Sequence, residues 1–246
     1  MQKKFDYIVV VPARYSSKRL PGKPLKLICG VPMIIRTCLQ CLKVVEKSSL
    51  IVATDDQRII ECCKKYHIKS ILTSKKCKTG TDRVAEVAKK IKVRNYINVQ
   101  GDEPLFNPLD LKKMIVAARS KKGGVLLGYT GIKNKNDYYN RNVPKVAFDN
   151  NENLLYASRS SIPFSLNSKN LKAWRQILVY SFPREKLIKF SLVKKKSNFE
   201  SLEDIEILRF LELGEKIRLI KMSSKSHPVD TIADLKFVRK FIKKNK

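Results

Sequence analysis

Short runs of apolar residues alternate with longer amphipathic stretches along the first half of the chain. The runs are rich in β-branched side chains, which suits strands buried on both faces of a parallel sheet. The pattern predicts strands at residues 8–11, 49–53, 69–73, 96–99 and 125–129, with helices at 31–45, 57–66, 79–91 and 109–120 between them. This alternation predicts an α/β fold, a three-layer α/β/α sandwich around a mainly parallel sheet.

The alternation breaks near residue 132, and residues 134–142 are polar and loop-like. Two short apolar runs, 146–148 and 154–157, are joined across residues 149–151 and predict a β-hairpin. The remaining pattern predicts a loop at 165–172, strands at 177–182 and 217–221, and helices at 184–191, 202–213 and 231–242. We therefore expect a single domain over residues 1–246, with residues 132–190 as a small β-rich insertion.

Length and composition describe a globular protein. The chain has 246 residues, of which 43% are hydrophobic and 30% charged, so it can bury a large core. No apolar stretch approaches the roughly 20 residues that span a bilayer. Residues 1–4 lead directly into a strand pattern, without the apolar segment of a signal peptide. These features predict a cytoplasmic protein with no membrane partner.

The formal net charge of +30 invites a nucleic-acid interpretation. However, the lysines are spread along the whole chain, and aromatic residues do not alternate with them as a base-stacking surface requires. We therefore expect no specific nucleic-acid partner, and a diffuse charge that attracts anionic substrates. A nucleic-acid-binding protein remains the alternative from a different functional class.

The six cysteines do not form a recognisable metal site. Cys38 and Cys41 make a CxxC pair inside a predicted helix, but no second pair or nearby histidine completes a zinc site. We expect all six to be reduced thiols, most of them buried.

The first strand ends in a loop with the chemistry of a phosphate site. Residues 12–24 combine small residues, two serines and the cations Arg14, Lys18, Arg19 and Lys23. Cations and backbone amides at the carboxyl end of a strand favour polyanions. The loop is not a P-loop, because Gly22-Lys23 is followed by Pro24 and no glycine lies five residues before Gly22. A plain basic surface turn is the alternative.

Two further loops are predicted at the same edge of the sheet. Residues 78–83 offer hydroxyls, a glycine and the start of a helix, and residues 100–104 place Asp102 at a strand end. An acid facing a phosphate site suits Mg²⁺, which usually takes one or two carboxylates and completes its shell with phosphate and water. Asp230 is a second candidate ligand, although it also reads as a helix cap with Thr231. A β-turn acid is the alternative for Asp102.

These segments resemble the 3-deoxy-manno-octulosonate (Kdo) cytidylyltransferase family. The resemblance is most specific in residues 9–25 and 98–104, and related loops occur in sialic-acid cytidylyltransferases. It extends in order over nearly the whole chain, through residues 51–55, 79–87, 145–146, 156–163, 200, 206–208, 214–217 and 229–231. It implies a nucleotide-diphospho-sugar transferase-like fold and a homodimer, with residues 132–190 as the dimerisation and sugar-side region.

The resemblance also implies a reaction, in which the anomeric hydroxyl of Kdo attacks the α-phosphate of CTP to give CMP-Kdo and pyrophosphate for lipopolysaccharide synthesis. Arg14, Lys23, Asp102 and Asp230 would be catalytic, the two aspartates holding Mg²⁺. CTP would be bound by Pro12, Ala13, Arg14, Ser16, Arg19, Lys23, Thr79, Gly80, Thr81, Arg83 and Gln100. The sugar acid would be bound by Arg159, Gln176, Glu200 and Glu206.

Two positions on the sugar side depart from the family. Gln176 stands where the family has a histidine, and Ile207 stands where it has a glutamine. Because polar contacts to hydroxyls discriminate strongly between substrates, these changes leave the acceptor open. Kdo is the first expectation, and the alternative is another 3-deoxy-2-keto sugar acid, either 8-amino-Kdo or a nonulosonate. A nucleotidyltransferase for some other phosphate or sugar is the other enzyme alternative.

Overall fold

The computed structural model describes residues 6–17, 19–120, 124–165, 171–224 and 226–245. The N-terminal residues 1–4, Lys18 of the first loop and most of the loop predicted at 165–172 lie outside these ranges. No helix in the described ranges is both long enough and apolar enough to cross a membrane.

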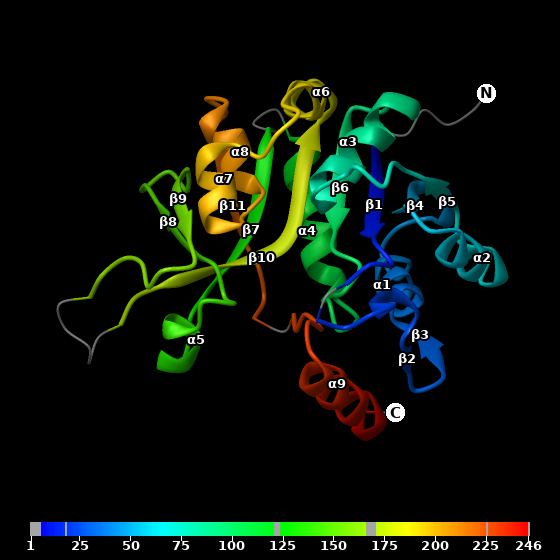
Figure 1. Ribbon diagram of the computed structural model, residues 1–246. Coiled ribbons are helices and arrows are strands. Elements are labelled where there is room, and N and C mark those ends of the chain that lie inside the picture. Colours follow the sequence, from blue (N-terminus) through cyan, green and yellow to red (C-terminus); the bar gives the residue numbers. More distant parts are fainter. Residues whose placement is uncertain (1–5, 18, 121–123, 166–170, 225, 246) are drawn as a thin grey trace.

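A twisted central sheet carries the fold (Figure 1). Its strands follow the spatial order β11-β7-β10-β6-β1-β4-β5. Only β10 runs against its neighbours β6 and β7 within this order, and the other strands run parallel to one another. The bounds are β1 (Tyr7–Ala13), β4 (Leu50–Thr54), β5 (Ser70–Leu72), β6 (Asn95–Val99), β7 (Val125–Gly131), β10 (Trp174–Pro183) and β11 (Ile217–Lys221).

Helices cover both faces of the sheet, because the central strands are apolar on both sides. One face packs on α1 (Met33–Cys41), α2 (Gln57–Lys65) and α4 (Pro108–Arg119). The other packs on α3 (Gly80–Lys90), α6 (Arg184–Leu192) and α8 (Ile207–Glu212). The predicted three-layer α/β/α sandwich with a mainly parallel sheet is confirmed.

The second half adds a β-rich extension at one side of the sheet (Figure 1). The predicted hairpin forms as β8 (Lys145–Phe148) and β9 (Leu154–Ser158), and β8 joins β10 where Lys145 pairs with Arg175. A short helix, α5 (Lys135–Tyr139), lies within the stretch that we expected to be a loop. Asn134 caps it by accepting a hydrogen bond from the Asp137 amide.

Two predicted helices differ in the structure. The stretch 31–45 begins with β3 (Val31–Pro32), which pairs with β2 (Leu27–Ile28), and only then becomes α1. The stretch 202–213 is split between α7 (Asn198–Glu203) and α8. Asp204 causes this break because its φ of 51° is left-handed and cannot continue a right-handed helix. The chain ends in α9 (Ile232–Lys244), and the 3-10 turns η1 (Lys23–Leu25) and η2 (Lys47–Ser49) complete the elements.

Candidate active site

The three loops expected to meet do so at the carboxyl ends of β1, β5 and β6. Two glycines mark how closely they approach. A Cβ on Gly101 would lie 2.7 Å from the Pro12 carbonyl oxygen. A Cβ on Gly80 would lie 2.9 Å from the side-chain nitrogen of Gln100 and 3.2 Å from the Pro12 ring. The Gly101 contact is with backbone and leaves no room for a side chain, whereas at Gly80 the flexible Gln100 side chain could shift.

A cluster of opposite charges forms where the first and third loops meet. The Lys23 ammonium donates to Asp102 Oδ2 at 2.6 Å and to Asp230 Oδ1 at 3.1 Å. The Arg19 guanidinium contacts the same Asp230 oxygen at 2.9 Å. Burial alone would lower the pKa of Lys23, but the two carboxylates outweigh it and raise that pKa above its ordinary value. The structure thus brings together four of the predicted site residues from distant parts of the chain.

Local backbone geometry positions Lys23 in this cluster. Gly22 adopts a left-handed φ of 66°, and Pro24 fits the start of the η1 turn, where no amide donor is needed. The Tyr15 hydroxyl lies 3.2 Å from where a Cβ on Gly22 would be. The Arg58 guanidinium stacks over the Tyr15 ring at 3.4 Å, so the loop is also supported from α2.

The Asp102 and Asp230 carboxylates fit a magnesium ion that arrives with phosphate. Asp102 Oδ1 is buried and has no hydrogen-bond partner among the described residues, so it is able to accept a ligand. Nowhere in the described ranges do three or more His, Cys, Asp or Glu side chains form a group that could hold a metal by themselves. Two carboxylates supplemented by phosphate oxygens and water are, however, the usual magnesium environment.

The segment that carries Asp230 is tied to the Asp102 loop at two points. The Val229 amide donates to the Asp102 carbonyl at 2.9 Å, and the Ser226 hydroxyl is hydrogen-bonded to Glu103. Burial raises the pKa of the Glu103 carboxyl to about 8, and the neighbouring Asp102 acts in the same direction. These ties hold two acids together that are 128 residues apart in sequence (230 − 102).

The start of α3 forms the second side of the site. Thr79 caps the helix in a reciprocal capping box with Asp82. The Glu206 carboxylate accepts from the Thr81 amide at 2.9 Å and from the Gln100 side chain at 3.0 Å. Burial raises the pKa of Glu206, opposed by hydrogen bonds from the Thr79–Thr81 turn. Predicted nucleotide residues and a predicted sugar residue therefore share one hydrogen-bonded group.

The remaining residues of the first loop differ in exposure. Pro12 and Ala13 are buried at the end of β1, whereas Arg14 and Ser16 are exposed. Among the residues that the structure describes, Arg14 has no hydrogen-bond or ion-pair partner. Its guanidinium is therefore available to an anionic ligand at the mouth of the loop.

Several predicted site residues already have protein partners. Arg83 is buried, with its guanidinium on Asp55 at 2.5 Å and on the Thr73 hydroxyl at 2.8 Å. Arg159 donates to the carbonyls of Arg141, Glu203 and Asp204 at the end of β9. Their predicted contacts with CTP and sugar remain predictions.

On the sugar side, Gln176 is buried on β10, and its Oε1 has no hydrogen-bond partner in the part of the chain that the structure describes. Glu200 is fully buried and makes a bidentate ion pair with Arg209, both contacts at 2.6 Å. Arg209 also contacts Asp82 Oδ1 at 2.8 Å and so joins α7, α8 and α3. Gln176 has an acceptor to offer a ligand, whereas the Glu200 carboxylate is occupied. Their sugar-binding roles stay predictions.

Sequence reasoning did not single out Arg209, Glu103 or Ser226. The sequence carries no clear signal for Arg209, because its neighbours Leu208 and Phe210 point to other faces of the helix. There is also none for Ser226, whose neighbours form no recognisable pattern.

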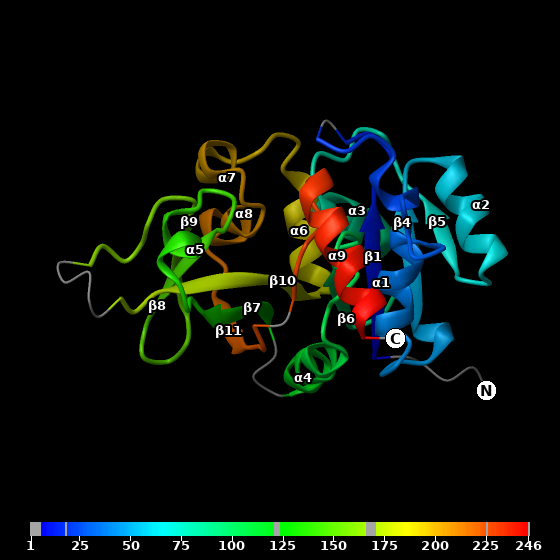
Figure 2. The same cartoon turned by 90° about the horizontal axis from the view of Figure 1, so that it is seen from below.

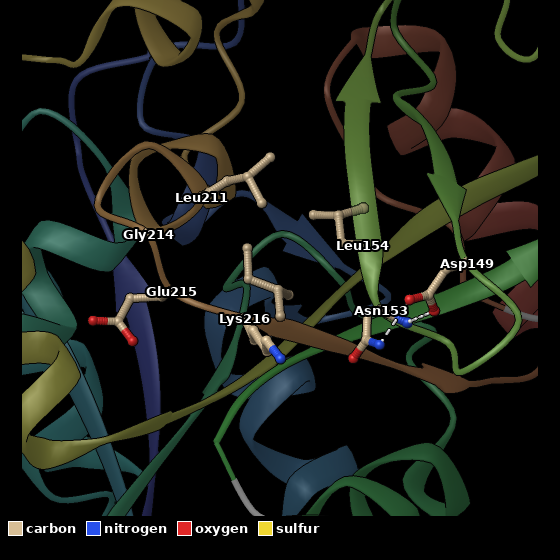
Figure 3. A pocket seen from close by; sticks show the side chains of 8 residues that line it. Asp149, Asn153, Leu154, Leu211, Gly214, Glu215 and Lys216 are labelled. Atoms are coloured by element: carbon tan, nitrogen blue, oxygen red, sulfur yellow. Dashed lines mark hydrogen bonds between the residues drawn. The ribbon is translucent and has the colours of Figure 1, made fainter.

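A cavity of about 330 Å³ lies away from these loops, between β9 and the turn from α8 to β11. Figure 3 shows the Leu154 and Leu211 side chains extending into it and Asp149 hydrogen-bonded to Asn153. The Glu215 carboxylate is held by Lys186 at 2.7 Å and Lys189 at 2.9 Å. No predicted site residue lines this cavity, and we do not assign it to the reaction.

Comparisons with known proteins agree with this geometry. A sequence profile of the cytidylyltransferase family matches residues 8–217. The 3-deoxy-manno-octulosonate cytidylyltransferase of Escherichia coli is 33% identical over 232 residues, 94% of each chain. That of Geobacter metallireducens is 37% identical over 92% of this chain and 93% of its own. An 8-amino-3,8-dideoxy-manno-octulosonate cytidylyltransferase from a Shewanella species is 35% identical over 94% of this chain and 96% of its own.

Solved structures give the same result. CMP:2-keto-3-deoxy-manno-octonic acid synthetase complexed with CTP superposes with a TM-score of 0.90 and 33% identity, covering 98% of this chain and all of that one. HddC from Yersinia pseudotuberculosis shares the fold, with a TM-score of 0.71 at 15% identity over 96% of this chain and 99% of its own. The chain belongs to the 3-deoxy-manno-octulosonate cytidylyltransferase family.

Proposed function

We propose that this protein transfers CMP from CTP to the anomeric hydroxyl of 3-deoxy-manno-octulosonate, releasing pyrophosphate, with Mg²⁺ held by Asp102 and Asp230. The observation that carries the proposal is the charge cluster at the carboxyl ends of β1 and β6. There a lysine bridges two aspartates, and one buried Asp102 oxygen has no hydrogen-bond partner. That arrangement offers both a cation for phosphate and acids for a metal.

The residues of the cluster act by positioning and charge. Arg14, Arg19 and Lys23 neutralise the triphosphate, and Lys23 exchanges its two carboxylates for phosphate oxygens as the nucleotide enters. Asp102 and Asp230 would hold the magnesium ion, which would supply Lewis-acid chemistry at the α-phosphate and lower the pKa of the attacking hydroxyl. Transfer of this kind needs little covalent help from the protein, so electrostatic stabilisation of the displaced pyrophosphate supplies most of the rate.

Residues of β10 and α8 form the proposed acceptor end of the site. Gln176 presents a buried oxygen without a partner, which can accept a hydrogen bond from a hydroxyl of the sugar acid. Ile207 is buried in the apolar core beside the site and offers no polar contact. An amino group at carbon 8 is the alternative donor, but the relative that uses the 8-amino sugar is no more similar to this chain than those that use Kdo. We retain Kdo as the acceptor.

The protein is further proposed to act in the cytoplasm as a homodimer formed through residues 132–190. Two exposed apolar side chains in that region, Leu155 and Phe164, support an interface there.

Pyrophosphate release from CTP, measured with a panel of 3-deoxy-2-keto sugar acids and with or without Mg²⁺, tests the proposed reaction. We expect turnover with Kdo, and thermal stabilisation by CTP with Mg²⁺ greater than that by ATP or random duplex DNA. Turnover only with 8-amino-Kdo or a nonulosonate would show that this sugar acid, and not Kdo, is the acceptor. Stabilisation by DNA or ATP but not by CTP would refute the activity.

A further inference from the structure

The C-terminal helix α9 is attached to the body of the protein along one narrow face. Leu235 and Val238 are buried there against Ile28 and Met33. The Arg239 guanidinium donates twice to the Leu27 carbonyl, at 3.0 and 2.7 Å, which fixes the helix on the β2–β3 hairpin. The rest of the helix faces outward, and in Figure 2 it lies across the outer side of the molecule near the carboxyl end of β1.

The outward side of α9 combines cations with large apolar side chains. We call it the α9 surface; it consists of Leu27, Lys236, Phe237, Lys240, Phe241, Lys243 and Lys244. The phenylalanines are 50% and 47% exposed and Leu27 is 52% exposed. The four lysines are exposed and have no hydrogen-bond or ion-pair partner within the described ranges.

Among the described residues, no acid pairs with the lysines of this surface. The acid within α9, Asp234, is occupied at the helix start, where it accepts from the amides of Asp230 and Thr231. Beside the helix, a groove of about 620 Å³ runs between α9 and the hairpin, lined by Leu27, Cys29, Gly30, Lys236, Arg239, Lys240 and Lys243. Four cations around one groove attract an anionic surface and repel a second copy of the same helix.

The apolar residues decide between a nucleic acid and a lipid surface. Leu27 has no aromatic face on which a base could stack. The ring centroid of Phe237 lies 4.5 Å from that of His227 and 6.3 Å from that of the stacked Phe241 ring. One side of the Phe237 ring is therefore covered. A bilayer surface, in contrast, offers anionic headgroups for the lysines and an apolar layer just beneath them for the phenylalanines and Leu27.

We propose that the α9 surface binds the protein reversibly to the surface of a bilayer that contains anionic phospholipids. Sequence analysis predicted no membrane partner because no segment is long enough to span one. A helix that lies in the headgroup layer needs no such segment, since only its exposed face enters the lipid. Because α9 begins at Ile232, shortly after Asp230, such binding holds the charge cluster close to the membrane.

Co-sedimentation of the full chain with vesicles tests this proposal. We expect binding to vesicles of phosphatidylcholine with phosphatidylglycerol, weak binding to pure phosphatidylcholine, and a decrease as salt rises. Replacing Lys236, Lys240, Lys243 and Lys244 with glutamine should weaken binding at least about tenfold, since each lysine near an anionic surface contributes. The double variant Phe237→Ser/Phe241→Ser should weaken it at low and high salt alike.

Matched control variants remove the same kinds of side chain at positions outside the α9 surface. Replacing Lys64, Lys65, Lys75 and Lys76 with glutamine removes the same charge, and Leu109→Ser/Leu192→Ser removes comparable exposed apolar groups. We expect both controls to bind vesicles as the unchanged protein does, and all four variants to retain CTP turnover, which reports folding. Equal losses of vesicle binding in the variants and the controls would overturn the proposal, as would no vesicle binding at all. It would also be overturned if the α9 surface were required only for binding duplex DNA. Because vesicle binding is read without turnover, its failure is distinguishable from failure of the proposed reaction.

Discussion

At the scale of single residues, the site is defined by which charged groups have partners within the protein and which do not. Lys23 has two carboxylates, Asp102 has one oxygen without a partner, and Arg14 has no partner among the described residues. These are the properties of a site that exchanges internal contacts for contacts with a ligand. The roles of Asp102 and Arg14 can be separated by measuring how turnover depends on Mg²⁺, on CTP and on the sugar acid.

Asp102→Asn should lower Mg²⁺-dependent turnover at least about 100-fold, since changes even one shell beyond a metal cost 10–100-fold in affinity or activity. The fold should survive, because the amide can still occupy the same loop. Pyrophosphate release over a Mg²⁺ titration checks this, and Asp6→Asn, an exposed acid at the start of β1, is the control. Turnover within a few-fold of normal would refute the metal role.

Arg14→Ala should raise KM for CTP by about 10-fold or more, the value of a lost charge-assisted contact. KM for the sugar acid should change less than about twofold. Initial rates with each substrate varied in turn check this, with Arg119→Ala as a control for loss of an exposed arginine on α4. An equal rise in both KM values would contradict the triphosphate role.

At the scale of elements, the site depends on close contact between loops and on buried charge between helices. The first and third loops touch through Pro12 and Gly101, where a side chain would clash with backbone. Helices α7, α8 and α3 are joined by the fully buried Arg209, whose partners are Glu200 and Asp82. Changes at these contacts should affect the site without altering any predicted ligand-binding side chain.

Gly101→Ala should destabilise the fold by about 1–3 kcal/mol and raise KM for CTP, because the new Cβ forces the loops apart. Gly131→Ala is the matched control, since a Cβ there meets nothing within 4 Å. Its stability should stay within about 0.5 kcal/mol of normal. Urea unfolding and CTP kinetics check both variants, and similar stability of the two would show that the loops do not need the contact.

Arg209→Met should cost about 3–5 kcal/mol, because it leaves the Glu200 carboxylate buried without a partner. Lys189→Met removes a half-exposed partner of Glu215 and should cost about 1 kcal/mol or less. Urea unfolding at neutral pH compares the two. A loss below about 1 kcal/mol for Arg209→Met would mean that the ion pair does not hold the three helices together.

At the scale of the whole molecule, two exposed apolar surfaces are proposed to have different partners. One would contact a second copy of the chain, and the other would contact a bilayer. The β-rich extension and α9 each expose large apolar side chains, and at the α9 surface exposed lysines lie beside them. Like charges repel one another, which argues against contact between two copies of α9, and the extension remains the proposed interface.

Light scattering should give a mass of about twice the 28.3 kDa of one chain. Leu155→Asp/Phe164→Asp should shift this mass toward one chain, because two charges would have to be buried at the interface. Leu192→Asp, an equally exposed apolar residue outside the extension, should leave the mass unchanged. A single-chain mass for the unchanged protein at working concentration would exclude the homodimer.

The layered fold and the chemistry of the loops can be predicted from the sequence alone. Apolar runs of strand length, alternating with helical spacing, can bury their side chains only between two layers of helices. Cations and acids at strand ends indicated phosphate and metal, because parallel strands deliver their loops to one edge.

The contacts of those groups, in contrast, depend on how distant segments pack together. The antiparallel direction of β10, the break between α7 and α8, and the ties from Glu103 to Ser226 join residues far apart in sequence. The same holds for the α9 surface, whose lysines appear in sequence as part of a diffuse charge. A helix divides its residues among faces, and only packing on the β2–β3 hairpin determines which face remains exposed.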